Sequence, residues 1–277
     1  MAERIREKNL IGSKKLSEIL MNENVKILDA SWFLSEPKKG YAVYKKNHIP
    51  GAIFFDIDFI FKTKRNIPHM MPEKNFFQIY LQKMGIRNFD KIIIYDQIGF
   101  FTSCRVWFTL KIFGHKEVLI LDGGFKNWIK QKLKTSNLIP SNKKSIYTIK
   151  FDETKIKNKL DVKKSISKNE FLIVDARPEE RFKAMIDEPR KSVARGKIPS
   201  SINIPFNKIF DSNGFLLNDK KLNKIFKIKD FFFEKKIIVS CGSGITACNI
   251  IFALEILGKR FNYLYDGSWS EWGHIEI

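Results

Sequence analysis

The sequence predicts an α/β protein made of two similar domains in tandem, each a parallel sheet with helices on both faces. Three observations carry this prediction. Short, fully apolar runs alternate with helical patterns, similar segments recur in the same order in both halves, and a polar stretch separates the halves. Strands that are apolar throughout are typical of parallel sheets covered on both faces.

The internal repeat is the clearest of these signals. Four segments of the first half have partners in the second half at offsets of 144 to 149 residues. The pairs are Asp29-Ala30-Ser31 with Asp175-Ala176-Arg177, His48 to Ala52 with Lys197 to Ser201, Ile92 to Asp96 with Ile237 to Cys241, and Asp122-Gly123-Gly124 with Asp266-Gly267-Ser268. A period this long indicates two domains rather than a solenoid of short repeats.

The pattern of apolar residues gives the expected elements. Strands are expected at 25–29, 92–96, 118–121, 171–175, 237–240 and 262–265. Helices are expected at 13–21, 73–83, 103–113, 126–132, 161–168, 178–183, 219–226 and 245–257. The stretch 136–154, with Pro140 and several Lys, Ser and Asn residues, is typical of a linker. We therefore expect an N-terminal domain over 1–140, a linker over 141–154 and a C-terminal domain over 155–277.

The chain is strongly basic, with 50 Lys and Arg against 30 Asp and Glu and a net charge of +20. Such a charge is often found in nucleic-acid binders. Here the lysines accompany an excess of Ile, Asn and Phe throughout the chain, and the densest basic runs lack the interleaved aromatic residues of a base-stacking platform. We interpret the charge as a solvated basic face and expect no nucleic-acid partner.

Cysteine content and hydropathy indicate the setting. Three cysteines without a CxxC pair form neither a disulfide framework nor a zinc motif, which favours a reducing compartment. No apolar run approaches the roughly 18 residues of a membrane span, and Met1 to Leu10 lacks a signal-peptide core. The sequence thus predicts a cytoplasmic protein with no membrane partner and with neither a metal ion nor an organic cofactor.

One segment carries the residues expected of a reaction centre. The strand expected at 237–240 leads directly into Cys241-Gly242-Ser243-Gly244-Ile245-Thr246-Ala247, and a helical pattern follows. Ligands of open parallel sheets bind beyond the carboxyl ends of the strands. The glycines let the backbone curl so that amide N–H groups converge, and the helix N-terminus adds positive potential. Cys241 is therefore predicted to be a reactive thiolate, with a small buried core cysteine as the alternative.

The length of this loop argues against two other kinds of cysteine chemistry. A phosphatase of the Cys-x5-Arg type needs arginine at position 247, where this chain has Ala247, so the side chain that clamps a phosphoryl group is missing. A papain-like protease needs different sequence around its cysteine. A thiolate in a cradle of amides suits a negatively charged or polarisable sulfur.

The loop closely resembles the CGSGVTA loop of the 3-mercaptopyruvate sulfurtransferases, a family with tandem rhodanese domains, with Ile245 in place of valine. The resemblance covers essentially the whole chain and includes Asp29 to Trp32, His48 to Phe55, Arg105 to Trp107, Asp122 to Gly124 and Tyr265 to Trp272. Thiosulfate-type rhodaneses usually carry charged residues just after the cysteine, whereas Gly242 and Ser243 are uncharged. The resemblance implies a rhodanese-like fold for both domains and 3-mercaptopyruvate as the sulfur donor.

The resemblance also implies roles for residues outside the cysteine. Arg181 and Arg190 are expected to bind the carboxylate and keto oxygen of the substrate, because a planar guanidinium can grip a carboxylate with two hydrogen bonds. Ser243, His69 and Asp58 are expected to form a proton relay across the domain interface. The other loop residues expected to border the substrate are Gly242, Gly244, Ile245 and Thr246. Without the resemblance, the arginines would be interpreted as surface charges, His69 as an exposed loop residue and Asp58 as a turn or helix cap.

Some positions depart from the family pattern. Glu180 stands where glycine is usual before Arg181, and Lys197 stands where histidine is usual in the second half. In the first half, Asp96 holds the place of Cys241. A carboxylate cannot carry a sulfane sulfur, so that domain is expected to be catalytically silent and to form one wall of the cleft. Cys104 and Cys248 fall within helical patterns and are expected to be core residues.

The expected reaction has two steps. Cys241 takes the sulfur of 3-mercaptopyruvate as a persulfide and releases pyruvate, and a thiol, a reduced thioredoxin-like protein or cyanide then removes that sulfur. Two alternatives remain open. One is a thiosulfate sulfurtransferase that uses the same persulfide, and the other is a non-catalytic binding module that keeps the fold.

Overall fold

Two five-stranded parallel sheets lie next to each other in the computed structural model, which describes residues 2–34, 36, 38–61, 63–64, 66–97, 99–227, 235–260 and 262–275. The first sheet has the order β1 (Leu10–Ile11), β5 (Val118–Leu121), β4 (Lys91–Tyr95), β2 (Val25–Asp29) and β3 (Ile53–Phe54). The second repeats this order with β6 (Ile156–Lys157), β10 (Asn262–Tyr265), β9 (Lys236–Ser240), β7 (Phe171–Asp175) and β8 (Ile202–Asn203). The predicted α/β fold with two parallel sheets is confirmed.

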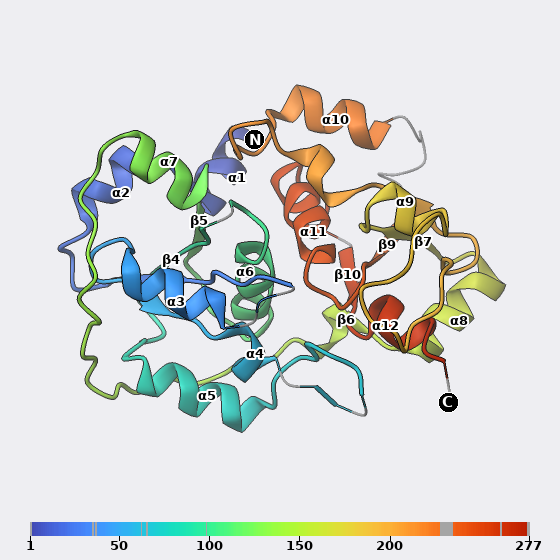
Figure 1. Ribbon diagram of the computed structural model, residues 1–277, viewed down its shortest axis with the longest axis horizontal. Helices are drawn as coiled ribbons and strands as arrows, with labels where there is room; N and C mark the ends of the chain where they lie inside the picture. The colour runs from blue at the N-terminus through green and yellow to red at the C-terminus, as the bar shows by residue number, and fades with distance from the viewer. Residues whose placement is uncertain are drawn as a thin grey trace.

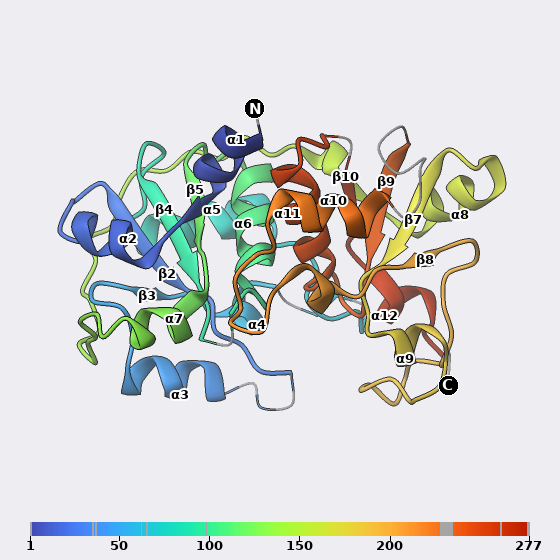
Figure 2. The ribbon, with the colours of Figure 1, turned by 90° about the horizontal axis from the view of Figure 1, so that it is seen from above.

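Helices cover both sheets and fill the space between them (Figures 1 and 2). Those of the first half are α1 (Ala2–Asn9), α2 (Ser13–Ile19), α3 (Lys39–Lys46), α4 (Ile57–Ile60), α5 (Lys74–Lys83), α6 (Ser103–Ile112) and α7 (Gly124–Lys130). Those of the second half are α8 (Lys159–Lys168), α9 (Glu179–Phe182), α10 (Asp219–Lys227), α11 (Ala247–Ile256) and α12 (Ser268–Trp272), with 3₁₀ turns at η1 (Glu153–Lys155) and η2 (Phe206–Ile209).

The expected strands and helices all coincide with observed elements, with ends that agree to about two residues. The elements that the sequence analysis did not predict are short or weakly patterned. The edge strands β1, β3, β6 and β8 have two residues each, too few to show a period. Helix α3 buries only Gly40 and Tyr44, so it has no continuous apolar stripe.

Helices α6 and α11 form the contact between the halves. Figure 1 shows them side by side between the two sheets, and both are buried on nearly every side. A helix enclosed by two sheets and a partner helix has no solvent face, which explains its apolar sequence. Cys104 and Cys248 lie in these helices and are fully buried, so the prediction that they are core residues is confirmed. The rings of Trp107 and Phe252 meet edge to face at 4.9 Å.

The segment between the halves runs along the outer side of the first half before it enters β6 (Figure 1). Residues 137–152 contain no helix or strand. Tyr147 is an exception to its polar character, because its side chain is 1% exposed and its hydroxyl lies 2.9 Å from His115 Nδ1. This part of the chain is therefore anchored to the first half.

Candidate active site

Cys241 is the first residue beyond β9, at the carboxyl edge of the second sheet, and residues 242–246 lead from it into α11. The strand–loop–helix arrangement expected from the sequence is present. Gly244 has φ +76°, and a Cβ at this position would lie 2.9 Å from the Asp266 carbonyl oxygen, so the turn requires glycine. Only 1% of Cys241 is exposed, which means that the loop and its neighbours cover the thiol.

The backbone amides of this loop lack acceptors. Within the described residues, none of the N–H groups of residues 242–247 donates a hydrogen bond to the protein. The loop is held instead through its carbonyl groups, since Cys241 O accepts from Trp269 N at 2.9 Å and Gly242 O accepts from Ser270 N at 2.9 Å and Ser270 Oγ at 2.6 Å. N–H groups without an acceptor carry partial positive charge, so a loop that contains several of them next to Cys241 suits an anionic sulfur.

Two arginines of the segment after β7 approach this loop. Arg181, on α9, lies against Gly242, where an added Cβ would be 3.0 Å from Arg181 Nη2. Its guanidinium is already engaged, because Nε donates to Glu188 Oε1 at 3.2 Å and Nη2 donates to Glu188 Oε2. Glu188 also accepts from Arg177 Nη1 at 2.7 Å, so it is shared between two arginines.

Arg190 differs from Arg181 because its guanidinium makes no hydrogen bond or ion pair with any described residue. Burial lowers the pKa of Arg190, and the like charge of Arg181 lowers it further. Cys241, Glu188 and Asp58 lie near enough to oppose this effect and raise the pKa of Arg190. A partly buried cation that has no partner among the described residues is suited to contact an anion.

The three residues of the predicted relay do come together, across the contact between the halves. His69 Nδ1 lies 2.9 Å from Ser243 Oγ, and His69 Nε2 lies 3.2 Å from Asp58 Oδ1. Asp58 is also held by Trp32 Nε1, which donates to both carboxylate oxygens at 2.9 and 3.0 Å. An ionised Asp58 can only accept hydrogen bonds. A neutral His69 therefore donates a hydrogen bond from Nε2 to Asp58 and accepts one at Nδ1 from the Ser243 hydroxyl.

The surroundings of these groups set their charge. Burial lowers the pKa of His69 below its ordinary 6.5; Arg190 and Arg105 add to this effect, and Asp58 opposes it. Burial alone would raise the pKa of Asp58, but hydrogen bonds from His69 and Trp32 outweigh it and hold that pKa below 3.8. The pair is therefore a neutral imidazole beside a carboxylate at neutral pH. His69 is 5% exposed, so it is a buried residue rather than an exposed loop histidine.

Some residues around the site escaped the sequence analysis. Trp32, Glu188 and Asp266 were given no role, although Trp32 and Asp266 lie in recurring motifs. Arg105 was named only as part of a motif, yet its fully buried guanidinium contacts His69 O, Gly244 O and Asp266. The sequence did contain a signal for this role, namely an arginine within an otherwise apolar helix pattern. An unpaired charge is too costly to bury, so such an arginine indicates a buried partner.

The two departures from the family pattern lie away from the thiol. Glu180 is exposed on α9. The Lys197 ammonium lies 4.8 Å from the centre of the Phe182 ring, which gives it a cation–π contact in place of a histidine's hydrogen bonds. Neither residue hydrogen-bonds to the loop of Cys241 in the part of the chain that the structure describes.

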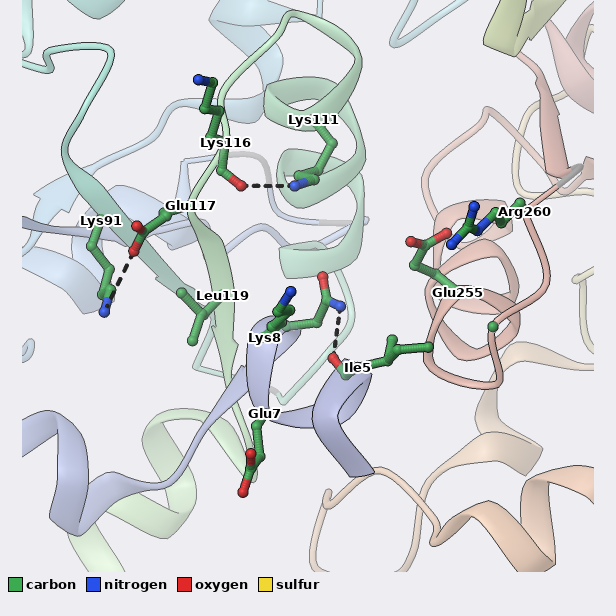
Figure 3. A pocket seen from close by; sticks show the side chains of 12 residues that line it. Ile5, Glu7, Lys8, Lys91, Lys111, Lys116, Glu117, Leu119, Glu255 and Arg260 are labelled. Carbon is green, nitrogen blue, oxygen red and sulfur yellow. Dashed lines mark hydrogen bonds and ion pairs between the residues drawn. The ribbon is translucent and has the colours of Figure 1, made fainter. Parts of the chain in front are cut away.

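A cavity of about 680 Å³ lies at the C-terminal ends of α6 and α11 (Figure 3). It is lined by α1, the chain before β5 and the end of α11. Two of its lysines have local partners: Lys91 pairs with Glu117 at 3.5 Å, and Lys111 Nζ donates to the backbone carbonyl oxygen of Lys116 at 2.8 Å. No predicted site residue lines it, so this cavity is separate from the active site.

No group of three or more His, Cys, Asp or Glu side chains among the described residues is placed to hold a metal ion. No helix among these residues has the length and apolar character needed to cross a membrane.

Comparison with known proteins identifies the family. Residues 13–131 and 158–274 each match the Rhodanese-like domain family. The chain belongs to the rhodanese family. Each matched segment contains four of the five strands of one sheet, all but the edge strands β1 and β6, so this is a tandem rhodanese protein with the two similar domains that the repeat predicted.

Its relatives in the rhodanese family are sulfurtransferases, and this chain is one as well. It is 35% identical to the 3-mercaptopyruvate sulfurtransferase of Mus musculus over 95% of this chain and 91% of the relative. It is 34% identical to that of Escherichia coli K12 over 95% and 94%, and 31% identical to the thiosulfate sulfurtransferase of Gallus gallus over 96% and 93%. The crystal structure of SseA from Escherichia coli, a 3-mercaptopyruvate sulfurtransferase, superposes with a TM-score of 0.85 at 32% identity, covering 94% of this chain and 98% of SseA.

Proposed function

We propose that this rhodanese-family sulfurtransferase takes sulfur from 3-mercaptopyruvate, holds it as a persulfide on Cys241 and passes it to a thiol or cyanide. The observation that carries this proposal is the guanidinium of Arg190 near Cys241, which has no hydrogen-bond or ion-pair partner among the described residues. A donor with a carboxylate supplies the missing counter-charge, and Arg181 is placed to contact the same molecule. The uncharged Gly242 and Ser243 leave these arginines as the groups that recognise the anion.

In the first step, the Cys241 thiolate attacks the sulfur of 3-mercaptopyruvate. A sulfur–sulfur bond forms, the carbon–sulfur bond breaks, and its electron pair remains on the carbon as the enolate of pyruvate. The negative charge of the resulting persulfide is stabilised by the free N–H groups of residues 242–247. Gly242, Gly244, Ile245 and Thr246 act here through their backbone, as part of this amide lining.

The relay moves one proton during that step. The Ser243 hydroxyl takes the proton of the substrate thiol and at the same time passes its own proton to His69. His69 then returns a proton through Ser243 to the enolate, which leaves as pyruvate. The 2.9 Å contact between His69 and Ser243 supports this path. The carboxylate of Asp58, 3.2 Å from His69 Nε2, stabilises the imidazolium that forms in between. The thiol proton of the donor thus ends in the methyl group of pyruvate, and the anionic persulfide remains on the enzyme.

In the second step, an acceptor thiolate or cyanide attacks the outer sulfur and restores the Cys241 thiolate. The acceptor is a small thiol or a thioredoxin-like protein, and the setting is cytoplasmic, in keeping with three free cysteines. The first domain, over 1–140, has Asp96 in place of the cysteine and serves as a silent wall that supplies His69 and Asp58. The linker is placed at 141–154 and the catalytic domain at 155–277.

A comparison of two donors tests this proposal. Pyruvate release from 3-mercaptopyruvate and thiocyanate formation from thiosulfate are measured with cyanide as acceptor. We expect kcat/KM for 3-mercaptopyruvate to exceed that for thiosulfate by at least about 10-fold, the effect of one well-placed charge-assisted interaction. A preference for thiosulfate would make the protein a thiosulfate sulfurtransferase, and no turnover of either donor would make it a binding module.

A further inference from the structure

We propose that Arg105 is a positioning residue for sulfur transfer, which holds His69 of the first half at the correct distance from Ser243 of the second. Arg105 lies in the first turn of α6, and its side chain is fully buried at the contact between the halves. The inference rests on the proposed function only in that it assigns the His69–Ser243 contact to the reaction.

The guanidinium touches the backbone on both sides of this contact. Arg105 Nη2 donates to the carbonyl oxygen of His69 at 2.7 Å, and Nη1 donates to that of Gly244 at 3.2 Å. Gly244 directly follows Ser243 in the loop. One rigid, planar group is therefore bonded to the backbone of the histidine and to the backbone next to its serine partner.

Asp266 completes the arrangement from the second half. Its Oδ1 accepts from Arg105 Nη2 at 2.8 Å, and its Oδ2 accepts from the backbone N–H of Met71 at 2.8 Å. The segment from His69 to Met71 is thus held at two points, by Arg105 and by Asp266. Asp266 follows β10 and is rigidly placed, because its side chain is 5% exposed and its own carbonyl packs against Gly244.

His69 needs such support because of its backbone. Its φ of +58° lies in the left-handed region, which is unfavourable for a residue with a Cβ. Such a conformation persists where the surroundings fix it. The charged hydrogen bonds to His69 O and Met71 N are the groups that fix this turn, and they come from a residue pair that spans the two halves.

A lysine cannot replace this arginine without loss. Its ammonium is a single point donor and cannot bridge two carbonyls and a carboxylate in one plane. Arg105→Lys keeps the positive charge opposite Asp266 but releases either His69 or Gly244. Because a misplacement of about 1 Å can cost on the order of 100-fold in rate, we expect kcat for 3-mercaptopyruvate to fall by about 10- to 100-fold. KM should change less than about 3-fold, since the carboxylate-binding arginines are not involved.

Arg6 provides a matched control. It also joins the two halves by an arginine–aspartate pair, with Nη2 2.9 Å from Asp219 Oδ1, and it donates to Leu217 O. This pair joins α1 to α10 (Figure 1), and neither helix contains a predicted site residue. Arg6→Lys should leave kcat unchanged, so a loss limited to Arg105→Lys cannot be ascribed to weaker contact between the halves in general.

A readout that does not depend on the donor separates failure of this inference from failure of the proposed function. The ring signals of the four histidines are followed by NMR against pH, and His69→Gln identifies those of His69. Asp58, Arg190 and Arg105 are the charged groups that face this ring. In Arg105→Lys the titration midpoint of His69 should rise towards 6.5 as the ring loosens and gains water, and in Arg6→Lys it should not move.

The outcomes are distinct. An unchanged His69 titration together with an unchanged kcat in folded Arg105→Lys overturns the inference, whichever donor the enzyme prefers. So does an equal fall of kcat in Arg105→Lys and Arg6→Lys. If Arg105→Lys does not fold, the same two measurements on Asp266→Asn decide, because that change keeps the side-chain shape but replaces one acceptor by a donor. A shifted titration with unaltered turnover also overturns the inference, because Arg105 would then hold His69 without any effect on sulfur transfer.

Discussion

Asp96 and Cys241 occupy equivalent places, each as the first residue beyond the central strand of its sheet, β4 or β9. In the first half, the Asp96 carboxylate accepts hydrogen bonds from backbone N–H groups of the loop that follows it. Its Oδ1 accepts from Gly99 N at 2.5 Å, and its Oδ2 accepts from the backbone N–H groups of Thr102 and Ser103 at 3.1 Å each. The loop thus encloses an anion that belongs to the chain.

The loop of the second half has no such carboxylate, and of the three equivalent N–H groups only that of Cys248 has an acceptor in the described part of the chain, Ile245 O at 3.1 Å. Gly244 and Ala247 correspond to Gly99 and Thr102 of the first half, and their N–H groups donate to no acceptor among the described residues. We infer that the anionic sulfur at Cys241 takes the place that the carboxylate of Asp96 has in the silent domain.

The first prediction concerns the stability of the silent loop. Asp96→Ala leaves buried N–H groups without an acceptor, so the free energy of unfolding should fall by on the order of 3 kcal/mol. Asp161→Ala, which removes an exposed carboxylate from the capping box of α8, should cost about 1 kcal/mol. Urea unfolding of both variants provides the comparison. Equal losses would mean that Asp96 is an ordinary helix cap.

The second prediction concerns the arginines. Arg190→Gln should raise KM for 3-mercaptopyruvate by about 10- to 100-fold, which corresponds to about 1.5–3 kcal/mol for a lost charge-assisted hydrogen bond. Arg181→Gln should raise it less, because Arg181 shares its charge with Glu188. Arg195→Gln serves as control, since Arg195 is half exposed and pairs with Asp187 on the surface. Parallel losses with thiosulfate would show that these arginines support the loop rather than bind a carboxylate.

The third prediction concerns the relay. His69→Gln should lower kcat for 3-mercaptopyruvate by roughly 100-fold, the lower end for general acid–base catalysis, and should change thiosulfate cleavage little because no proton is needed there. Ser243→Ala combined with His69→Gln should be no worse than the more damaging single change, since residues that act as a unit are not additive. Independent, multiplying losses would remove the relay from the mechanism.

The fourth prediction concerns pH. The lowered pKa of His69 means that the unfolded chain binds this proton more readily than the folded protein. The stabilisation from neutral His69 is therefore complete above pH 6.5 and is lost as the pH falls towards the lowered pKa. The free energy of unfolding of the wild type, minus that of His69→Gln, should decrease as the pH is lowered from 7 to 5. A difference that is flat over this range contradicts the burial of a neutral imidazole.

The sequence predicted the parts of this structure that repeat or that have a clear period. The central strands and the helices α6 and α11 are long and apolar, so their patterns give both position and burial. The strand, loop and helix around Cys241 could be placed because glycines and a strand end mark the turn. The contact between His69 and Ser243 came from family resemblance, since no local pattern relates residues so far apart in the chain.

The remaining features depend on how the halves meet. Nothing in the sequence indicates that Arg105 bonds to the carbonyl oxygens of His69 and Gly244, because these are backbone atoms of distant segments. The partnership of Arg181 with Glu188 depends on the fold of a loop without periodicity. For the same reason, the sequence did not predict that Cys241 and His69 are almost completely covered.

The central claim, a persulfide on Cys241, is tested most directly by the intact mass of the protein after brief exposure to 3-mercaptopyruvate. The protein should gain the mass of one sulfur atom, mapped by peptide analysis to Cys241 and removed by a reducing thiol. Cys241→Ser should gain nothing, while Cys104→Ala and Cys248→Ala should keep the adduct, because burial raises the pKa of both of those thiols and keeps them protonated at neutral pH. Sulfur mapped to Cys104 or Cys248, or an unchanged mass in the wild type while pyruvate is released, would contradict this account.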